Sequence, residues 1–406
     1  MGSKRIEAVE LTQTERGKLW LSQFSSAELD AATSLMTNIT LVSHSEFERS
    51  ITSLIESEAE SVGGPVALFA TRDVDYGVPY LSEFTQSEAV ERGADLGSEA
   101  RIANIIRNIS RRVPDKYLNH PSIDSMRSVK CRSLFVVDDF IGSGDRTNDF
   151  IDAIWSNKTV RSWWSSKLID VRALCYSATE AGRKAVCKAR SRPKVVLRRD
   201  CPTYFSLAMS RRERNQIAAV IKKKAAYTNF PDMPFGHGNV SAAIAFEHGC
   251  PDNCPPIIWS ETANWHSLFP ERSVASKEAS AFPPEILARN PSQVLLGIGQ
   301  KRLSISLALS RRGPIGATIL VVLALVAKGI RTRAALGHAT GLSSKDCSRI
   351  LDRCIQWKLV TPQLRITESG RVELKYARRL VEPEKGLPPR GKDSYFPTQL
   401  RRPVAD

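Results

Sequence analysis

The stretch LFVVDDFIGSGDRTNDF, from Leu134 to Phe150, carries the pattern that predicts the fold of this 406-residue chain. Its first four residues are apolar, and this run is short enough for a buried strand and too short for a helix. Two adjacent carboxylates, Asp138 and Asp139, follow directly. We therefore expect a strand that places negative charge at its carboxyl end.

A glycine-rich turn follows the two acids. Gly142, Ser143 and Gly144 permit a tight turn, and Asp145 or Thr147 can cap the helix that comes next. Exposed backbone N–H groups and the positive end of a helix dipole favour a phosphate monoester in such a turn. The acids would repel phosphate, so they suit ribose hydroxyls or a hydrated Mg²⁺ ion. A sugar phosphate therefore suits both the acid pair and the glycine-rich turn.

This segment resembles the phosphoribosyl diphosphate (PRPP) loop of type I phosphoribosyltransferases, in which four apolar residues, two acids and two apolar residues precede a small turn. The resemblance implies that Asp138 and Asp139 are the catalytic acids facing the ribose, that Gly142 to Thr147 hold the 5-phosphate, and that Mg²⁺ accompanies the ligand. Gly142 and Arg146 depart from the family pattern, which usually has Thr or Ala and Thr or Ser there. Binding tolerates these changes better than catalysis, so enzymatic activity stays open.

The flanking segments predict the rest of an α/β core. A strand at Val66–Ala70 and a helix opened by Gly97-Ser98-Glu99 precede the acid pair. Strands at Leu168–Ala178 and Lys194–Leu197 follow it, with a helix at Glu180–Ala189 between them. This alternation indicates a Rossmann-like fold with a parallel sheet.

The resemblance also gives roles to two loops of the core. In that family the loop after the first strand contacts pyrophosphate, which makes Thr71, Arg72 and Asp73 candidates, Arg72 first among them; an ordinary polar loop is the alternative. Residues 113–130, which include His120, are candidates for a mobile cover over a bound diphosphate, on their position alone.

The segment from Phe235 to Pro270 differs in composition from its surroundings, with strands expected at Ser241–Phe246 and Ile257–Trp259. It contains residue types that bind zinc, namely His237, His248, Cys250, Cys254 and His266. The two cysteines have no matching second pair, so we expect turn and packing roles and no metal site. The resemblance makes Trp259, Asn264, Trp265 and Phe269 candidates to contact an acceptor base, with ordinary core aromatics as the alternative.

The carboxyl-terminal part resembles a winged helix-turn-helix. Helices are expected at Ala317–Lys328, Thr332–His338 and Ser344–Lys358, followed by a hairpin over Leu359–Leu374 that turns at 368–370. The predicted domains are a helical cap (1–60), a phosphoribosyltransferase-like domain (61–272), a linker (273–315), the winged helix (316–382) and a flexible tail (383–406).

The third of these helices is the recognition helix of a winged helix. Its apolar residues recur at helical spacing and leave a mostly cationic outer face. Lys345, Arg349 and Arg353 would then contact nucleic acid, and Arg371 near the wing tip would meet a phosphate. Binding of a protein partner is the alternative.

The charge and composition of the chain limit which classes of partner and which cell compartment we expect. The formal net charge is +15, more than solubility needs, which favours a polyanion such as nucleic acid; a basic soluble enzyme is the alternative. A cationic helix at Arg211–Tyr227 is either a solvated face or a nucleic-acid surface. Eight cysteines without repeated spacing, and no signal-like segment, predict free thiols in the cytoplasm. The longest apolar run, Ala317–Ala327, is too short to cross a bilayer.

The sequence FIGSG at 140–144 follows the acid pair, and a late strand, the sequence CPDNCP at 250–255 and the sequence WHSLFP at 265–270 come after it. By this arrangement, residues 30–272 also resemble the phosphoribosyltransferase-like proteins of bacterial conflict systems, including those encoded beside retron reverse transcriptases. Two functions follow as hypotheses. The chain is an anti-phage defence effector, with DNA or RNA–DNA and a reverse transcriptase as partners and pentosyl transfer as its chemistry if it is active. Alternatively, it is a DNA-binding regulator that senses PRPP or a nucleotide without catalysis. A homo-oligomer is compatible with both hypotheses.

Overall fold

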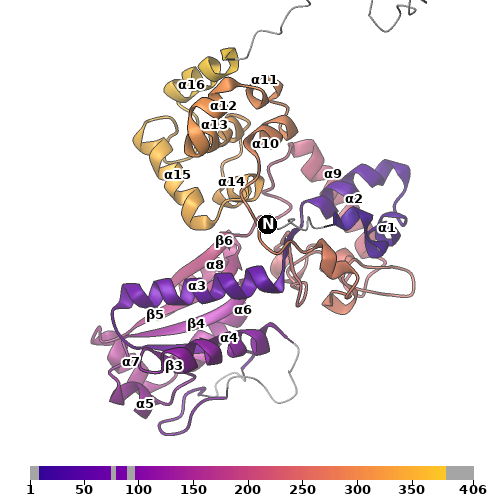
Figure 1. Cartoon of the computed structure of the whole chain (residues 1–406). Coiled ribbons are helices and arrows are strands. Elements are labelled where there is room, and N and C mark those ends of the chain that lie inside the picture. The colour runs from indigo at the N-terminus through magenta and orange to yellow at the C-terminus, as the bar shows by residue number, and fades with distance from the viewer. Residues whose placement is uncertain (1–8, 75–78, 89–96, 381–406) are drawn as a thin grey trace, which may run out of the picture. The chain divides into compact units, whose positions relative to one another are not determined.

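The computed structural model describes residues 9–74, 79–88 and 97–380, whose helices and strands are shown in Figure 1. The chain divides into two compact units. The first unit contains Met1–Arg289 and Ile330–Asp352, and the second contains Asn290–Gly329 and Arg353–Asp406. Among the described helices, none is both long enough and apolar enough to span a membrane.

The first unit is organised around a five-stranded parallel sheet in the order β3-β2-β4-β5-β6. Its strands are β2 (Val66–Ala70), β3 (Tyr117–Asn119), β4 (Ser133–Ile141), β5 (Asp170–Ala178) and β6 (Lys194–Asp200). Strand β4 lies at the centre and is buried along its whole length, as expected for a strand that is covered on both faces. The predicted α/β core is confirmed.

Two layers of helices cover the sheet. They are α3 (His44–Val62), α4 (Ser98–Arg112), α5 (Ile123–Ser128), α6 (Asp145–Trp155), α7 (Lys158–Ser165) and α8 (Glu180–Cys187). Phe135 and Val137 of β4 pack in the cluster that contains α3 and α4, whereas Leu134 and Val136 pack with Phe150 of α6. Successive side chains of a strand point to opposite faces, so both faces of β4 must be apolar, and the uninterrupted apolar run follows from this.

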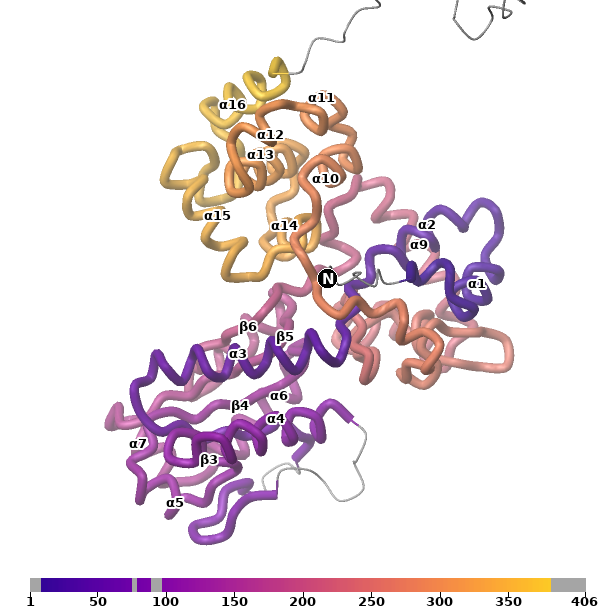
Figure 2. The backbone as a smooth tube through the Cα atoms, viewed as in Figure 1, coloured from indigo at the N-terminus to yellow at the C-terminus, as the bar shows by residue number. Residues whose placement is uncertain are grey.

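A second group of elements brings the amino-terminal helices together with residues 201–269. It contains α1 (Glu15–Leu21), α2 (Ser26–Thr37), β1 (Thr40–Val42), α9 (Arg211–Ala225) and β7 (Ile244–Phe246). Strand β1 pairs in parallel with β7, and Figure 2 shows α2 beside α9. The indole of Trp20 donates to the carbonyl of Ile257 at 2.8 Å and packs on Trp265. The amino-terminal helices are therefore part of the same core as residues 201–269.

Two predicted strands differ from the structure. Strand β7 is shorter than the predicted Ser241–Phe246, and the strand predicted at Ile257–Trp259 is wrong, because a 3₁₀ turn spans Pro256–Ile258. Two consecutive prolines, Pro255 and Pro256, fix φ and remove N–H donors at this point, which favours a turn over a ladder.

The helices predicted for the carboxyl-terminal part are present. They are α13 (Gly313–Ala327), α14 (Arg333–Thr340) and α15 (Ser344–Gln356). The region predicted as a linker contains three short helices, α10 (Pro291–Gly297), α11 (Lys301–Ser304) and α12 (Leu307–Arg311). Helix α13 is apolar on all sides, and nine of its own residues are buried, as expected for a helix at the centre of its unit.

The hairpin predicted at Leu359–Leu374 is wrong. One antiparallel bridge joins Val360 to Ile366, and helix α16 then spans Glu368–Arg379. Thr367 caps this helix, because its hydroxyl accepts a hydrogen bond from the N–H of Gly370 at 3.2 Å. Arg371 consequently lies in the first turn of α16, 3.4 Å from Glu368, and not at a wing tip.

Within the first unit, hydrogen bonds connect strand β6 to the turn between α14 and α15. The Arg199 guanidinium donates to the carbonyls of Gly341, Leu342 and Ile286 at 2.7–3.0 Å. The next side chain, Asp200, accepts a hydrogen bond from Ser344 at 2.7 Å. Cations stabilise the carboxyl end of a helix, so Arg199 caps α14 while Asp200 holds the start of α15.

Candidate functional site

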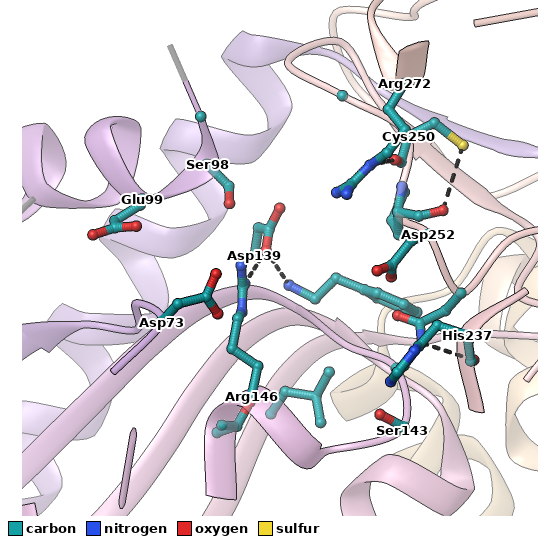
Figure 3. Close-up of a pocket in the computed structure, with 18 of the residues that line it drawn as sticks. Asp73, Ser98, Glu99, Asp139, Ser143, Arg146, His237, Cys250, Asp252 and Arg272 are labelled. Atoms are coloured by element: carbon teal, nitrogen blue, oxygen red, sulfur yellow. Dashed lines mark hydrogen bonds and ion pairs between the residues drawn. The ribbon is translucent and has the colours of Figure 1, made fainter. Parts of the chain in front are cut away.

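A cavity of about 730 Å³ lies where β4 ends (Figure 3). Ligands in open parallel sheets bind at the carboxyl ends of strands. The lining residues are Asp73, Gly97–Glu99, Asp139–Thr147, Asp149, His237, His248–Asn253 and Glu271–Ser273. The structure therefore brings the predicted turn together with a distant segment, residues 235–273, which we call the hood.

The two predicted acids have different positions. Asp139 lines the cavity, whereas Asp138 points to the opposite face of β4, is 1% exposed and does not line it. The carboxylate of Asp138 accepts hydrogen bonds from Arg146 at 2.5 Å and from the Thr147 hydroxyl at 3.1 Å. Asp138 therefore belongs to a buried network between β4 and α6.

Asp139 is also engaged by neighbouring side chains. One oxygen accepts from the Phe140 N–H at 2.8 Å and lies 3.3 Å from the Arg146 guanidinium; the other lies 3.1 Å from Nε2 of His248. Arg146 thus contacts both carboxylates, and Figure 3 shows it beside Asp139. Buried charges need counter-ions. The predicted contacts with ribose hydroxyls would bring no positive charge to the two carboxylates, and Arg146 supplies it.

Burial and charge shift these groups in opposite directions. Burial raises the pKa of Asp138 to about 7; the attraction of Arg146 opposes this rise, and the repulsion from Asp139 adds to it. Burial also opposes ionisation of Asp139, but the hydrogen bond from His248 and the charge of Arg146 outweigh it and lower the pKa of Asp139. The network therefore holds a proton on Asp138 more readily than on Asp139.

The turn after β4 has the geometry of an anion site. Gly144 has φ 95°, a left-handed conformation that suits glycine, and α6 begins directly after it, so Asp145 and Thr147 are not its caps. None of the N–H groups of Gly142, Ser143 and Gly144 donates to any residue that the structure describes. Free N–H groups at a helix start attract phosphate.

The close packing of the hood on the turn requires a glycine at position 142. A Cβ atom at Gly142 would lie 2.0 Å from Oδ1 of Asn253, whose amide donates to the carbonyl of His237 at 3.1 Å. A Cβ at Gly238 would lie 2.9 Å from the Cβ of Ser143. The departure from the Thr or Ala of the resembled pattern therefore has a steric cause, because the hood packs directly on the turn.

Three of the zinc-type residues of the hood, Cys250, Cys254 and His248, make packing contacts. Among the described residues, no three His, Cys, Asp or Glu side chains are placed to hold a metal ion. Cys250 and Cys254 are buried free thiols, and burial raises the pKa of Cys250 well above its ordinary value. His248 packs against Phe246 with ring centroids 5.0 Å apart. The two cysteines are therefore packing residues, and His237 and His248 line the cavity.

Three groups of predicted ligand contacts lie away from the cavity. Arg72 does not line it and lies 3.9 Å from Glu99, although Asp73 does line it. The cover predicted over residues 113–130 is wrong in its central part, because these residues form β3 and α5. His120 is fully buried, accepts the N–H of Ala70 at 2.9 Å, and has its pKa lowered to about 4 by burial.

The aromatic residues proposed for an acceptor base lie in the core. Trp259, Trp265 and Phe269 are buried in the main apolar cluster and do not line the cavity. The indole of Trp265 donates to the carbonyl of Ile257 at 2.9 Å. Tryptophan N–H groups usually find such partners when buried, so these residues stabilise the hood.

The predicted nucleic-acid residues lie on two helices. On α15, Lys345 and Arg349 are exposed and Arg353 is half-buried; on α16, Arg371 is exposed. Arg349 pairs with Asp346 at 2.8 Å, one turn earlier on the same helix. Lys345 and Arg349 therefore lie on an exposed face of α15, and Arg349 is paired with a carboxylate.

A parallel sheet whose central strand leads one acid of the pair and a glycine turn to a cavity is the arrangement expected of a phosphoribosyltransferase-like protein. Residues 18–271 match the family described as PRTase-CE. This match covers more than half of the chain, which therefore belongs to that family. Residues 320–402 match a second family, described as wHTH-PRTase associated. Neither the curated proteins nor the solved structures contain a match.

Proposed function

We propose that the cavity binds PRPP or a nucleotide and that the helix-turn-helix binds nucleic acid. The free N–H groups of Gly142, Ser143 and Gly144 carry the proposal, because they lie beside the start of α6 and next to a buried acid. They suit a ribose phosphate with its phosphate in the turn. Calorimetric titration with PRPP, ribose 5-phosphate and ribose tests this; equal, undetectable binding of all three would contradict it.

Magnesium fits the site only together with the phosphates of the ligand. Mg²⁺ keeps several waters and usually takes one or two carboxylates plus substrate phosphates. Asp73 and Asp149 line the cavity beside Asp139, whereas no described group of three ligands is placed to hold an ion alone. Affinity for PRPP should therefore fall when Mg²⁺ is replaced by EDTA, while the free protein should show little Mg²⁺ binding.

If the protein is an enzyme, the expected reaction is displacement of diphosphate from the anomeric carbon of the ribose. Mg²⁺ would neutralise the departing diphosphate. The residues of the chain would bind the 5-phosphate through the turn, orient the ribose beside Asp139 and exclude water with the hood. Diphosphate release from PRPP in the presence of nucleic acid is the assay.

The network around Arg146 favours a second candidate, a sensor that binds the ligand without turnover. Arg146 and His248 already occupy the acids that would contact the ribose hydroxyls. A ligand would have to compete with these internal partners for Asp139. Tight PRPP binding without diphosphate release, coupled to a change in DNA affinity, would support the sensor over the enzyme.

Nucleic-acid binding is supported by the exposed cations of α15 and by the net charge of +15. We propose that Lys345 and Arg349 contact phosphates. The double variant Lys345→Gln with Arg349→Gln should weaken binding and reduce the slope of log affinity against log salt by about 2. The same slope in the double variant and in wild type would contradict the assignment.

The biological setting that we propose is anti-phage defence in the bacterial cytoplasm, with a retron reverse transcriptase and its DNA or RNA–DNA product as partners. The resemblance to conflict-system proteins supports it. Copurification without nuclease treatment, followed by sequencing of bound nucleic acid, mass spectrometry of bound proteins and light scattering for the oligomeric state, tests it. Specific binding to the chain's own promoter would favour the regulator instead.

A further inference from the structure

The hood brings a cation to the cavity that sequence motifs did not indicate. Arg272 lines the cavity, and its side chain points toward the interior in Figure 3. Its Nε donates to the carbonyl of Cys250 at 2.9 Å. Within the part of the chain that the structure describes, its two terminal nitrogens form no hydrogen bond and no ion pair. A guanidinium edge is therefore available to a ligand.

The backbone fixes Arg272 firmly in place. Glu271 and Arg272 have φ of 48° and 66°, two consecutive left-handed residues that are not glycine. Such conformations persist only when neighbouring contacts hold them, and they occur often at ligand sites. Here the N–H of Cys250 donates to the carbonyl of Arg272 at 2.8 Å, so backbone and side chain both bond to the same residue.

The other positive groups of the cavity are already engaged. Arg146 is paired with the two acids of β4, and His248 contacts one of them. His237 lies 3.4 Å from Asp145. The remaining lining includes several carboxylates, so a ligand with a second phosphoryl group would be repelled except beside a free cation.

From this arrangement we infer that Arg272 binds the second phosphoryl group of a doubly phosphorylated ribose whose first phosphate occupies the Gly142–Gly144 turn. This inference rests on the proposed function and makes it more specific. A guanidinium whose Nε is occupied still presents two parallel N–H donors, which match two phosphate oxygens. Arg272 thus distinguishes a ribose with a second phosphoryl group from a ribose monophosphate. The resemblance had made Arg72 the candidate for contact with pyrophosphate.

The test compares PRPP, pyrophosphate and ribose 5-phosphate by calorimetry in Mg²⁺. Arg272→Gln should weaken PRPP and pyrophosphate by about tenfold or more, because a charge-assisted contact is lost. Ribose 5-phosphate should change by less than about twofold. Arg272→Lys keeps the charge without the paired donors and should give intermediate losses. Lys188→Gln, an exposed cation away from the cavity, is the control for net charge.

The outcomes separate this inference from the proposed function. If wild type binds none of the three ligands, the proposed function fails. If wild type binds PRPP no more tightly than ribose 5-phosphate, or if Arg272→Gln binds PRPP as wild type does, the role of Arg272 is overturned while the phosphate turn stands. Melting temperatures check folding; if Arg272→Gln is unfolded, the wild-type preference for PRPP and the Arg272→Lys titration decide.

Discussion

The two walls of the cavity differ in how their polar groups are satisfied. On the sheet side, the carboxylates of Asp138 and Asp139 are bonded to Arg146, Thr147 and His248. On the side of the turn and the hood, the N–H groups of residues 142–144 and the end of Arg272 have no described partner. The difference indicates that the sheet wall stabilises the fold, whereas the turn and the hood hold the polar groups that remain available for the ligand of the proposed function.

The largest expected effect comes from removing the counter-ion of the sheet wall. Arg146→Gln leaves two buried carboxylates without their shared counter-ion, which should lower the free energy of unfolding by about 3 kcal/mol, measured by urea denaturation. The double variant Arg146→Gln with Asp138→Asn should recover most of the loss, because one of the charges is gone. A loss below about 0.5 kcal/mol in the single variant would show that Arg146 is not structural.

Gly142 tests the contact between the turn and the hood. Gly142→Ala places a methyl group 2.0 Å from Oδ1 of Asn253, so the hood must shift. We expect a loss of about 1–3 kcal/mol in stability, together with weaker PRPP binding. Gly297→Ala is the matched control, because nothing lies within 4 Å of the added atom. Equal stability of the two variants would contradict the close packing.

Asp138 gives the sheet wall a pH dependence. Its pKa is raised from 3.8 to about 7, so the folded chain retains a proton that the unfolded chain has already released. Its contribution to stability is present below about pH 4 and is lost as the pH rises to about 7. Asp138→Asn removes this loss, so the variant should gain stability relative to wild type over that range. Parallel stability curves from pH 4 to 7 would contradict the shift.

Ser143 should have the smallest effect on stability. Its hydroxyl donates to Asp145 at 2.7 Å in an exposed turn, and such bonds contribute little to folding. Ser143→Ala should change the free energy of unfolding by less than about 0.5 kcal/mol. The affinity for ribose 5-phosphate should still fall by about threefold, since a ligand donor is lost. Unchanged affinity would remove Ser143 from the phosphate site.

The local part of the fold could be predicted because each signal lay within one short segment. The apolar run at Leu134–Val137, the acids after it and the glycines of the turn specify β4 and the start of α6 without distant contacts. The strand at Ile257 and the wing at Leu359–Leu374 failed for local reasons too: two prolines in one case, and a Thr367 helix cap taken for part of a hairpin in the other.

The cavity could be predicted only on the side of β4. Arg272 and Asn253 lie more than a hundred residues beyond the acid pair, and only the folding of the hood places them opposite it. Period-2 alternation already implied that Asp138 and Asp139 point to opposite faces. The pairing of Arg146 with both acids depends on the entry angle of α6, which local pattern does not specify.

The Arg199 contacts determine where the chain can be cut. The wHTH-PRTase associated match begins at residue 320, yet the carbonyls of Gly341 and Leu342 and the hydroxyl of Ser344 find their partners on β6. A fragment that starts at that boundary leaves the end of α14 uncapped and the start of α15 untethered. Dissection of this protein at family boundaries should therefore yield a destabilised carboxyl-terminal fragment, and full-length chains are the appropriate material for testing nucleic-acid binding.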